Sequence, residues 1–333
     1  VQKAKKYFNK FNGVVLVCYG DTPFLKNKTL RKLINSISTK RNNIALTCFN
    51  KSKRNTYGKI ILSENKQPLK ILEDKQSKSD IQLCNGGLIA FKSNDLVELL
   101  SNLKLNRSGN EYYLTDLIEI ASKKNLKIDL IKIDENEILG VNNKIELSEA
   151  EKVAQKNLRD YFLSVGATLL DPDTIFFSHD TIIEKDVIIH PHVVIGNNVK
   201  IKKYSEIFSF SHLEECTIYE NVKIGPFARI RGFSKIDQNS KIGNYVEIKK
   251  TQLGKNVKIN HLTYVGDSHV GDDSNIGAGT ITCNFDGYMK HETIIGKNTF
   301  IGSNSTLIAP IKIGDSATVA AGSVITENVQ KNS

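Results

Sequence analysis

Several residue types and patterns are rare or missing in this chain of 333 residues. It has no tryptophan, one methionine and six prolines. The longest unbroken apolar run, Val14–Cys18, is far shorter than the roughly 20 residues that cross a bilayer, and no signal-peptide pattern is present. We therefore expect a cytoplasmic protein that does not enter the membrane.

Cysteine is also sparse. The five cysteines are far apart in the sequence and form no Cys-x-x-Cys pair. An odd number of scattered cysteines predicts buried free thiols in a reducing compartment rather than a disulfide framework.

The positive charge is confined to one half of the chain. Residues 1–150 carry 26 Lys and Arg against 16 Asp and Glu, whereas residues 151–333 carry 20 of each. A basic first half favours polyanionic small molecules such as nucleotides, although a general bias toward lysine explains it equally well. No basic run with interleaved aromatic residues is present, so we expect no nucleic-acid partner.

Aliphatic residues recur every six positions in the second half. One series runs through Ile183, Ile189, Ile195, Ile201 and Ile207, and the last resumes at Ile295 and continues to Ile325. A period of six matches neither a helix nor a hairpin. It predicts a parallel β-helix, in which each unit forms one short strand and one turn, and the aliphatic side chains stack into a continuous core.

The first half alternates strand-like and helix-like segments. We expect strands at 14–18, 44–49, 57–62, 84–91 and 127–133, helices at 28–38 and 111–124, and a mostly parallel sheet. A polar helical stretch follows, and Asp171-Pro172-Asp173 ends it. The expected domains are an α/β domain at 1–146, a linker helix at 147–170 and the β-helix at 171–333.

Polar patches follow the expected strands of the first half. Tyr19-Gly20-Asp21 directly follows the first one, where an α/β sheet binds ligands and a carboxylate can hold Mg²⁺ against a phosphate. A plain turn explains this tripeptide equally well. The further patches lie at Gly58, Glu73, Asn85 and the stretch 140–143.

These patches, in their order along the chain, resemble the nucleotidyltransferase domain of sugar-nucleotide pyrophosphorylases. The string Asn-Glu-Tyr-Tyr-Leu-Thr-Asp at 110–116 adds to this resemblance. The nearest resemblance is to the bifunctional N-acetylglucosamine-1-phosphate uridylyltransferase/glucosamine-1-phosphate N-acetyltransferase family. It implies an incomplete Rossmann-like domain, because the family's Gly-rich phosphate loop is not in this sequence. It also implies Mg²⁺ at Asp21 and Asn142, with Asn143 left open as the alternative. The UDP-N-acetylglucosamine site would comprise Tyr19, Gly20, Asp21, Gly58, Glu73, Asn85 and Asn142.

Two strings inside the repeats carry the most specific resemblance. They are His-Leu-Thr-Tyr-Val-Gly-Asp at 261–267 and the stretch 275–287, after which the repeat breaks for a loop at about 285–292. They resemble the acetyltransferase domain of the same family. The resemblance implies that His261 is the general base, and Glu247 is a candidate for orienting its ring. It places glucosamine-1-phosphate at Arg231, Lys249, Tyr264, Asn275 and Lys290, and acetyl-CoA at Ala278, Asn284, Phe285, Ser303 and Ala321.

The resemblance implies an enzyme of cell-wall precursor synthesis. It would use acetyl-CoA, glucosamine-1-phosphate, UTP and N-acetylglucosamine-1-phosphate. Its β-helix would be left-handed, and it would form a homotrimer with acetylation sites between subunits. The family's basic C-terminal tail is not in this sequence, which predicts weakened acetyl-CoA binding.

Two other classes share some of these features. One is a non-enzymatic regulatory or exchange-factor subunit with the same two-part layout, which would have no need for the strings around His261 and Asn284. The other is a β-helical zinc enzyme. It would need three converging zinc-ligating histidines, which the spacing of His190, His192, His261 and His269 does not suggest.

Overall fold

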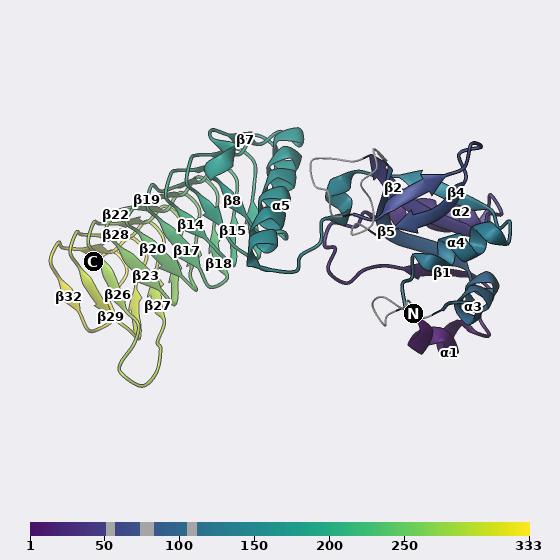
Figure 1. Cartoon of the computed structure of the whole chain (residues 1–333). Coiled ribbons are helices and arrows are strands. Elements are labelled where there is room, and N and C mark those ends of the chain that lie inside the picture. The colour runs from purple at the N-terminus through teal and green to yellow at the C-terminus, as the bar shows by residue number, and fades with distance from the viewer. Residues whose placement is uncertain (51–56, 74–82, 105–111) are drawn as a thin grey trace. The chain divides into compact units, whose positions relative to one another are not determined.

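The computed structural model describes residues 1–50, 57–73, 83–104 and 112–333. The chain divides into two compact units, Val1–Glu151 and Lys152–Ser333, and each is described by itself (Figure 1). No helix among the described residues is both long and apolar enough to cross a membrane.

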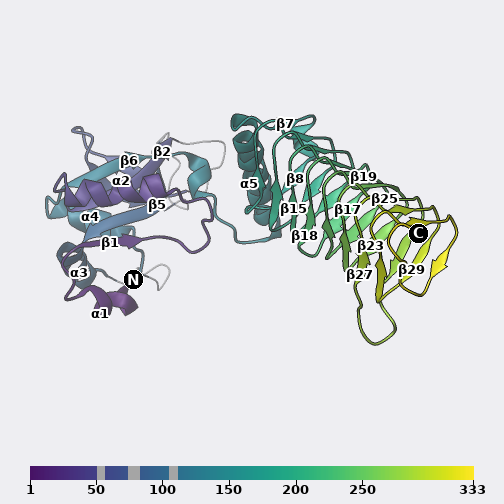
Figure 2. The same cartoon turned by 180° about the vertical axis from the view of Figure 1, so that it is seen from behind.

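The first unit is a sheet with helices on both faces (Figures 1 and 2). Along β2, Ala45 packs with Leu33 and Ile37 of α2 on one face, whereas Ile44 and Leu46 pack with α3 and α4 on the other. This alternation is the period-two pattern of a sheet buried on both sides. The strands are β1 (Val14–Val17), β2 (Ile44–Asn50), β3 (Lys59–Leu62), β4 (Pro68–Leu72), β5 (Leu83–Lys92) and β6 (Ile128–Lys132). The helices are η1 (Gln2–Ala4), α1 (Lys5–Phe8), α2 (Asn27–Ser38), α3 (Ser93–Ser101), α4 (Asp116–Lys123), η3 (Glu135–Ile138) and α5 (Lys144–Ser164), which continues into the second unit.

The expectation of a mostly parallel sheet is wrong for the part of the chain that the structure describes. Only β2 and β6 pair in parallel, whereas β5 runs antiparallel to β1, β2 and β3, and β3 and β4 form an antiparallel pair. Apolar runs predict strands but carry no information on strand direction. Because β5 runs against β1, its beginning lies at the same edge of the sheet as the end of β1.

Two further differences concern single elements. Strand β4 was not expected from the sequence, and the helix expected at 111–124 is α4, which begins at Asp116. Asn110 and Glu111 lie outside the described residues. The expected linker at 147–170 overlaps α5, which ends at Ser164, and the first strand of the coil already follows at Thr168–Leu169.

The second unit is a left-handed parallel β-helix with three faces. The first face consists of β7 (Thr168–Leu169), β10 (Ile188–Ile189), β13 (Glu206–Ile207), β16 (Lys223–Ile224), β19 (Lys241–Asn244), β22 (Lys258–His261), β25 (Asn275–Ile276), β28 (Phe300–Ile301) and β31 (Thr318–Val319). The second face consists of β8 (Phe176–Phe177), β11 (Val194–Ile195), β14 (His212–Leu213), β17 (Arg229–Arg231), β20 (Glu247–Lys249), β23 (Tyr264–Gly266), β26 (Ile281–Cys283), β29 (Thr306–Ile308) and β32 (Val324–Ile325). The third face consists of β9 (Ile182–Ile183), β12 (Val199–Ile201), β15 (Cys216–Ile218), β18 (Ser234–Ile236), β21 (Gln252–Leu253), β24 (Ser268–Val270), β27 (Thr293–Ile295) and β30 (Ile311–Ile313).

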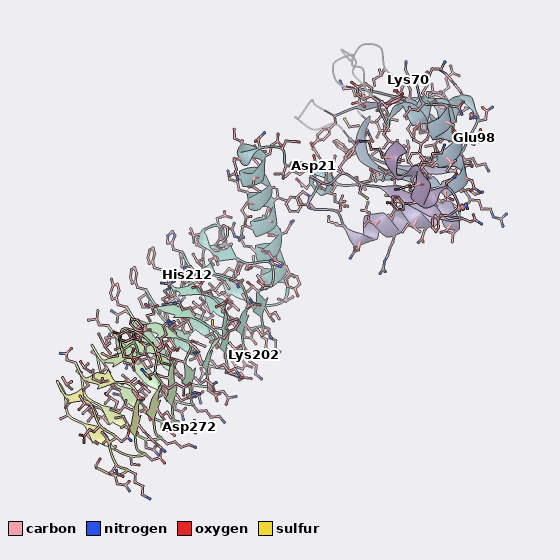
Figure 3. The ribbon with its side chains drawn as sticks, turned by 90° about the horizontal axis from the view of Figure 1, so that it is seen from below. Asp21, Lys70, Glu98, Lys202, His212 and Asp272 are labelled. Atoms are coloured by element: carbon pink, nitrogen blue, oxygen red, sulfur yellow. The ribbon has the colours of Figure 1, made fainter. Side chains whose placement is uncertain are left out.

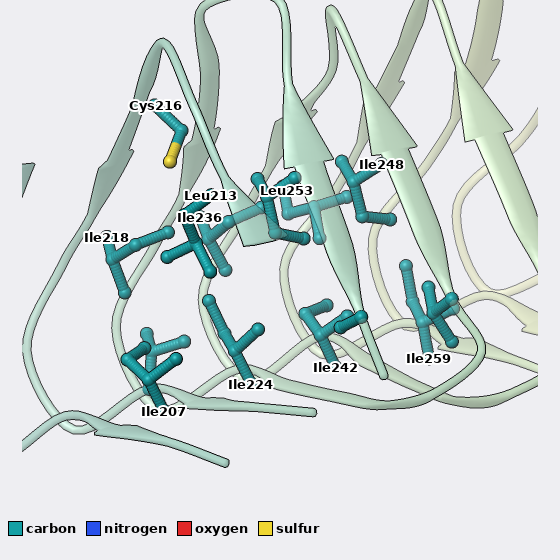
Figure 4. Packing of buried hydrophobic residues seen from close by; sticks show 14 of the residues in the cluster. Ile207, Leu213, Cys216, Ile218, Ile224, Ile236, Ile242, Ile248, Leu253 and Ile259 are labelled. Carbon is teal, nitrogen blue, oxygen red and sulfur yellow. The ribbon is translucent and has the colours of Figure 1, made fainter. Parts of the chain in front are cut away.

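A ladder of aliphatic side chains points inward along each face. Ile207, Ile224 and Ile242 are register partners in successive coils of the first face, and each is fully buried (Figure 4). Outward positions carry polar side chains such as Lys202, His212 and Asp272 (Figure 3). Helix α5 closes the first coil, where Phe162 packs on Phe177 and Gln155 bonds to the backbone of Phe177.

The turns between the faces are tight and use left-handed backbone. We call the turn from first to second face the first corner, and the turn from second to third face the second corner. The turn from third to first face places Asn or Asp in the left-handed region in most coils, for example Asn221 and Asn239. Apart from glycine, these residues adopt this conformation most readily. In five successive coils the first corner instead places bulky side chains there, namely His192, Phe210, Phe227, Tyr245 and Leu262.

Candidate functional sites

One edge of the α/β sheet gathers the polar residues of the first half. Tyr19, Gly20 and Asp21 follow the end of β1, and Asn85 lies at the beginning of β5. The backbone N–H of Val141 donates to the carbonyl of Asp21 at 3.0 Å, so the stretch 140–143 is tied to the same edge. A cleft of about 550 Å³ opens between these segments and the first turns of α5.

Asp21 and Asn142 flank Gly140 in this cleft. A methyl group at Gly140 would lie 3.4 Å from Asp21 Oδ2 and 3.8 Å from Asn142 Nδ2. One carboxylate and one amide oxygen are the hard ligands that a divalent cation takes together with substrate phosphates. The donor set therefore fits such an ion.

The structure separates the roles of the two adjacent asparagines. Asn143 Oδ1 accepts hydrogen bonds from the backbone N–H groups of Ile145 and Glu146, both at 3.0 Å, so its side chain caps α5. Asn142 donates hydrogen bonds from its Nδ2 and its backbone N–H to Glu146 Oε2. These contacts leave Asn142 Oδ1 for a ligand.

The other three expected residues lie side by side. Asn85 N–H donates to the carbonyl of Gly58 at 2.7 Å, and a methyl group at Gly58 would lie 3.5 Å from Glu73 Oε2. Glu73 Oε1 accepts a hydrogen bond from Thr115 at 2.7 Å. The structure thus brings residues from three distant stretches together.

Tyr19 lies over a glycine at this edge. A methyl group at Gly87, whose φ is 75°, would come within 2.4 Å of the Tyr19 ring, so only glycine fits there. Partial burial, followed by the nearby Glu73 and Asp21 carboxylates, raises the pKa of the Tyr19 hydroxyl. Tyr19 is therefore a neutral hydrogen-bond donor at the mouth of the cleft.

In the β-helix, His261 belongs to a column at the first corner. Asn244 is its register partner one coil earlier. Extending the registers of β22, β25, β28 and β31 by two residues places Ala278, Ser303 and Ala321 at the same position in the following coils. The column below His261 thus carries only small side chains, which leave room for an elongated ligand.

Asn244 holds the imidazole of His261. Its Oδ1 lies 2.5 Å from His261 Nδ1, and an amide oxygen only accepts hydrogen bonds. With this partner Nδ1 is the donor, and Nε2 has no partner among the residues that the structure describes. Glu247, the sequence-based candidate for this role, instead accepts a hydrogen bond from Arg231 Nε at 2.6 Å.

The outer surface of the second face carries the expected phosphate ligands. Arg231 at the end of β17 and Lys249 at the end of β20 are register partners, so their side chains leave neighbouring strands at the same level. Tyr264 begins β23 on the same surface and is the register partner of Glu247.

A charged cluster lies at the second corner. Asn284 Nδ2 donates to Asp267 Oδ2 at 2.5 Å and lies 3.4 Å from the Tyr264 hydroxyl. Lys249 Nζ is 3.7 Å from Asp267 Oδ2, and Lys290 approaches Lys249 from the loop that interrupts the coil. Direct contact with Lys249, together with its charge, lowers the pKa of Lys290.

Not every expected ligand joins these groups. Asn284 and the exposed Phe285 follow β26, whereas Ala278 precedes it, so the five expected acetyl-CoA residues lie at opposite ends of the second face. Asn275 begins β25 on the first face. His190 pairs with Glu206 at 3.0 Å, while His192 stacks on Phe210. These two histidines therefore have separate partners.

Sequence reasoning missed Asn244 and Asp267. Asn244 precedes His261 by 17 residues, and Asp267 precedes Asn284 by 17, which is the length of a coil in this region. Counting one coil from each suspected residue would have found both.

Comparisons with known proteins agree with the repeat architecture of the β-helix. Residues 215–250 match a family described as "Bacterial transferase hexapeptide (six repeats)", and residues 292–327 match "Hexapeptide repeat of succinyl-transferase". The chain is 44% identical to the bifunctional protein GlmU of Wolbachia pipientis wMel over 97% of this chain and 74% of the relative. It is 43% identical to that of Zymomonas mobilis over 100% and 75%, respectively. The chain belongs to the GlmU family.

Among solved structures, LpxA from Acinetobacter baumannii covers 48% of this chain and 67% of its own, with a TM-score of 0.39 at 19% identity. As a GlmU family member, the chain is a bifunctional enzyme of UDP-N-acetylglucosamine synthesis, with acetyltransferase and uridylyltransferase roles. It uses acetyl-CoA and small-molecule substrates. A non-enzymatic subunit finds no support.

Proposed function

We propose that the second face of the β-helix, with its two corners, is the site of acetyl transfer from acetyl-CoA to the amine of glucosamine-1-phosphate. The observation that carries this assignment is the Asn244–His261 pair above a column of small residues. It supplies a basic nitrogen next to a column of small side chains. The α/β unit carries the site that transfers UMP from UTP to N-acetylglucosamine-1-phosphate.

His261 acts as the general base. Its Nε2 removes a proton from the sugar amine while the amine nitrogen attacks the thioester carbonyl, and it returns the proton to the departing thiolate. A neutral imidazole is suited to both transfers near pH 7. Asn244 keeps it in the required tautomer through the hydrogen bond to Nδ1.

Arg231 and Lys249 hold the sugar phosphate, and Lys290 and Tyr264 complete this half of the site. Four cations, Arg231, Lys249, Lys250 and Lys290, surround two carboxylates, Glu247 and Asp267. The excess of positive charge favours a phosphate dianion, which charge-assisted hydrogen bonds bind strongly.

The first-corner column forms the acetyl-CoA groove. Ala278, Ser303 and Ala321 follow His261 in successive coils, which places about 4.8 Å between neighbours. A long pantetheine arm laid along this column would bring its thioester to His261. Asn284 and Phe285 bind the cofactor from the other end of the second face, and Asn275 belongs to the sugar site.

Incubating the protein with glucosamine-1-phosphate and acetyl-CoA, and following the product by mass spectrometry, tests this function. We expect the mass of one acetyl group to be added to the sugar phosphate. Glucosamine without the phosphate should react poorly, because Arg231 and Lys249 then have no partner. Absence of acetylated product from folded protein would contradict the proposal.

For uridylyl transfer, we assign Mg²⁺ to Asp21 and Asn142, and the UDP-sugar to Tyr19, Gly20, Gly58, Glu73 and Asn85. Asp21 and Asn142 would hold the ion through oxygen atoms, and the ion would neutralise charge on the reacting phosphates. Tyr19 would donate a hydrogen bond at the mouth of the cleft.

We further propose a homotrimer whose acetylation sites are shared between copies. The split of the acetyl-CoA residues between two corners supports a shared site. So does the exposed apolar ridge along the first corner, where Phe210, Phe227 and Tyr245 are stacked and each is 43–56% exposed. A closed ring of copies would bury this ridge.

Mixing two inactive variants tests the shared site. His261→Ala and Asn284→Ala each remove one half of the site. In a random mixed trimer, about 25% of shared sites combine an intact half from each copy, so activity should return to about that level. The shared site would be contradicted if mixed trimers recovered no activity. It would also be contradicted if light scattering showed a monomer and that monomer were fully active.

A further inference from the structure

Asp267 is a buried carboxylate to which the acetyl-transfer mechanism gives no chemical step. Its side chain is 3% exposed, and it lies at the second corner directly after β23, where its φ is 47°. A buried ionised group is costly unless several partners compensate it, so its surroundings indicate its role.

The partners of Asp267 come from both neighbouring coils. Asn284, 17 residues later, donates to Oδ2 at 2.5 Å. Lys249 and Lys250, one coil earlier, place Nζ 3.7 Å from Oδ2 and 3.3 Å from Oδ1. One carboxylate thus joins an acetyl-CoA ligand to a phosphate ligand.

The charge of Asp267 is maintained by these contacts. Burial acts to raise the pKa of Asp267, but the Asn284 amide and the two lysines outweigh it and hold the pKa below its ordinary value. The carboxylate is therefore ionised at neutral pH. It faces Lys249 and Lys250 directly, and Lys290 approaches the same cluster.

We propose that Asp267 is a positioning residue for acetyl transfer, which fixes Asn284 and Lys249 relative to each other and balances part of the lysine charge. This inference rests on the proposed acetyltransferase function. It predicts that acetyl-CoA binding and sugar-phosphate binding are coupled through one side chain that touches neither reacting atom.

Two substitutions separate the charge of Asp267 from its hydrogen bond. Asp267→Asn removes the charge but keeps an acceptor oxygen for Asn284. Asp267→Glu keeps the charge but displaces the acceptor by one methylene group. Asp272→Asn is the matched control, because Asp272 also pairs with a lysine, Lys297 at 3.1 Å, but outside the site.

For Asp267→Asn we expect the KM for glucosamine-1-phosphate to rise about tenfold, since Lys249 loses the carboxylate that fixes its position and its lysine neighbours displace it from the phosphate site. We expect kcat to fall much less. The alkaline limb of the pH profile of kcat/KM should also move to lower pH. Three groups act on Lys290: Lys249 lowers its pKa, whereas Asp267 and Tyr264 raise it, so removing Asp267 lowers it further.

For Asp267→Glu we expect the KM for acetyl-CoA to rise about tenfold while the alkaline limb stays in place, because Asn284 loses its position but the charge remains. Asp272→Asn should leave all three quantities unchanged. The proposal would be overturned if, in both Asp267 variants, the KM values for glucosamine-1-phosphate and acetyl-CoA stayed within twofold of wild type and the alkaline limb did not move.

Thermal unfolding of each variant identifies a purely structural role, in which stability falls while the KM values and the alkaline limb do not change. That outcome would also overturn the proposal. If one variant does not fold, the other still tests its own half of the prediction. Failure of wild-type protein to acetylate glucosamine-1-phosphate would instead contradict the proposed function, so the two failures are distinguishable.

Discussion

The two units of this chain position their functional residues in different ways. In the β-helix a fixed register does so: Asn244 and His261 are one coil apart and therefore adjacent. In the α/β unit, Asp21 and Gly140 have no periodic relation, yet a backbone hydrogen bond between Val141 and Asp21 joins their loops. A site on a solenoid can be counted along the sequence, whereas a site on a sheet edge depends on strand directions that the sequence does not encode locally.

This comparison predicts that a substitution at one site lowers the activity of that site and leaves the activity of the other site unchanged. Asp21→Ala should lower uridylyl transfer by about 10³-fold or more, because metal-ion charge stabilisation is worth several kcal/mol. Acetyl transfer should be unchanged. Both activities are measured on the same protein, and Asp134→Ala, whose side chain caps η3, is the control. Equal loss of both activities would break the comparison.

Arg231→Ala should act on substrate binding within the β-helix. A lost charge-assisted contact to phosphate costs about 1.5–3 kcal/mol, which corresponds to a rise in the KM for glucosamine-1-phosphate of about 10- to 100-fold. The value of kcat should change little, because the phosphate is held equally in ground and transition states. Steady-state kinetics measure both, and Arg229→Ala, from the same strand and 52% exposed, is the control. A fall in kcat with an unchanged KM would assign Arg231 to the chemical step instead.

The smallest effect on activity is expected in the core of the β-helix. Ile224 is fully buried between its register partners Ile207 and Ile242. Ile224→Ala should lower the free energy of unfolding by about 2–5 kcal/mol, with little change in kcat at low temperature. Ile182→Ala, at an outward position that is 53% exposed, should stay within about 0.5 kcal/mol of wild type. Denaturant unfolding measures both, and equal costs would contradict the inward ladder.

The sequence predicts the β-helix well because a single local rule, one aliphatic residue every six positions, repeats in every coil. It also predicts most strands of the α/β unit, but it fails on their directions, since an apolar run such as Leu88–Phe91 reads the same in both orientations.

The motif strings around His261 and Asn284 predict site residues but not the partners of these residues. Asn244 lies outside both strings, and Asp267 ends the first string without any local sign of its contact with Asn284. Only the stacking of coils brings each pair into contact. Glu247 was a reasonable candidate for holding His261, yet the nearby Arg231 guanidinium takes its carboxylate. Competition of this kind between partners is visible only in three dimensions.

The most direct test of the account is the acetyl-transfer rate of His261→Ala. We predict a fall in kcat of about 10²- to 10⁴-fold, the usual contribution of a positioned general base. The KM for glucosamine-1-phosphate should change little, because Arg231 and Lys249 hold the phosphate. His269→Ala, at an exposed position of the third face, should behave as wild type. A folded His261→Ala protein with near-normal kcat would contradict the assignment of the base and of the first-corner site built around it.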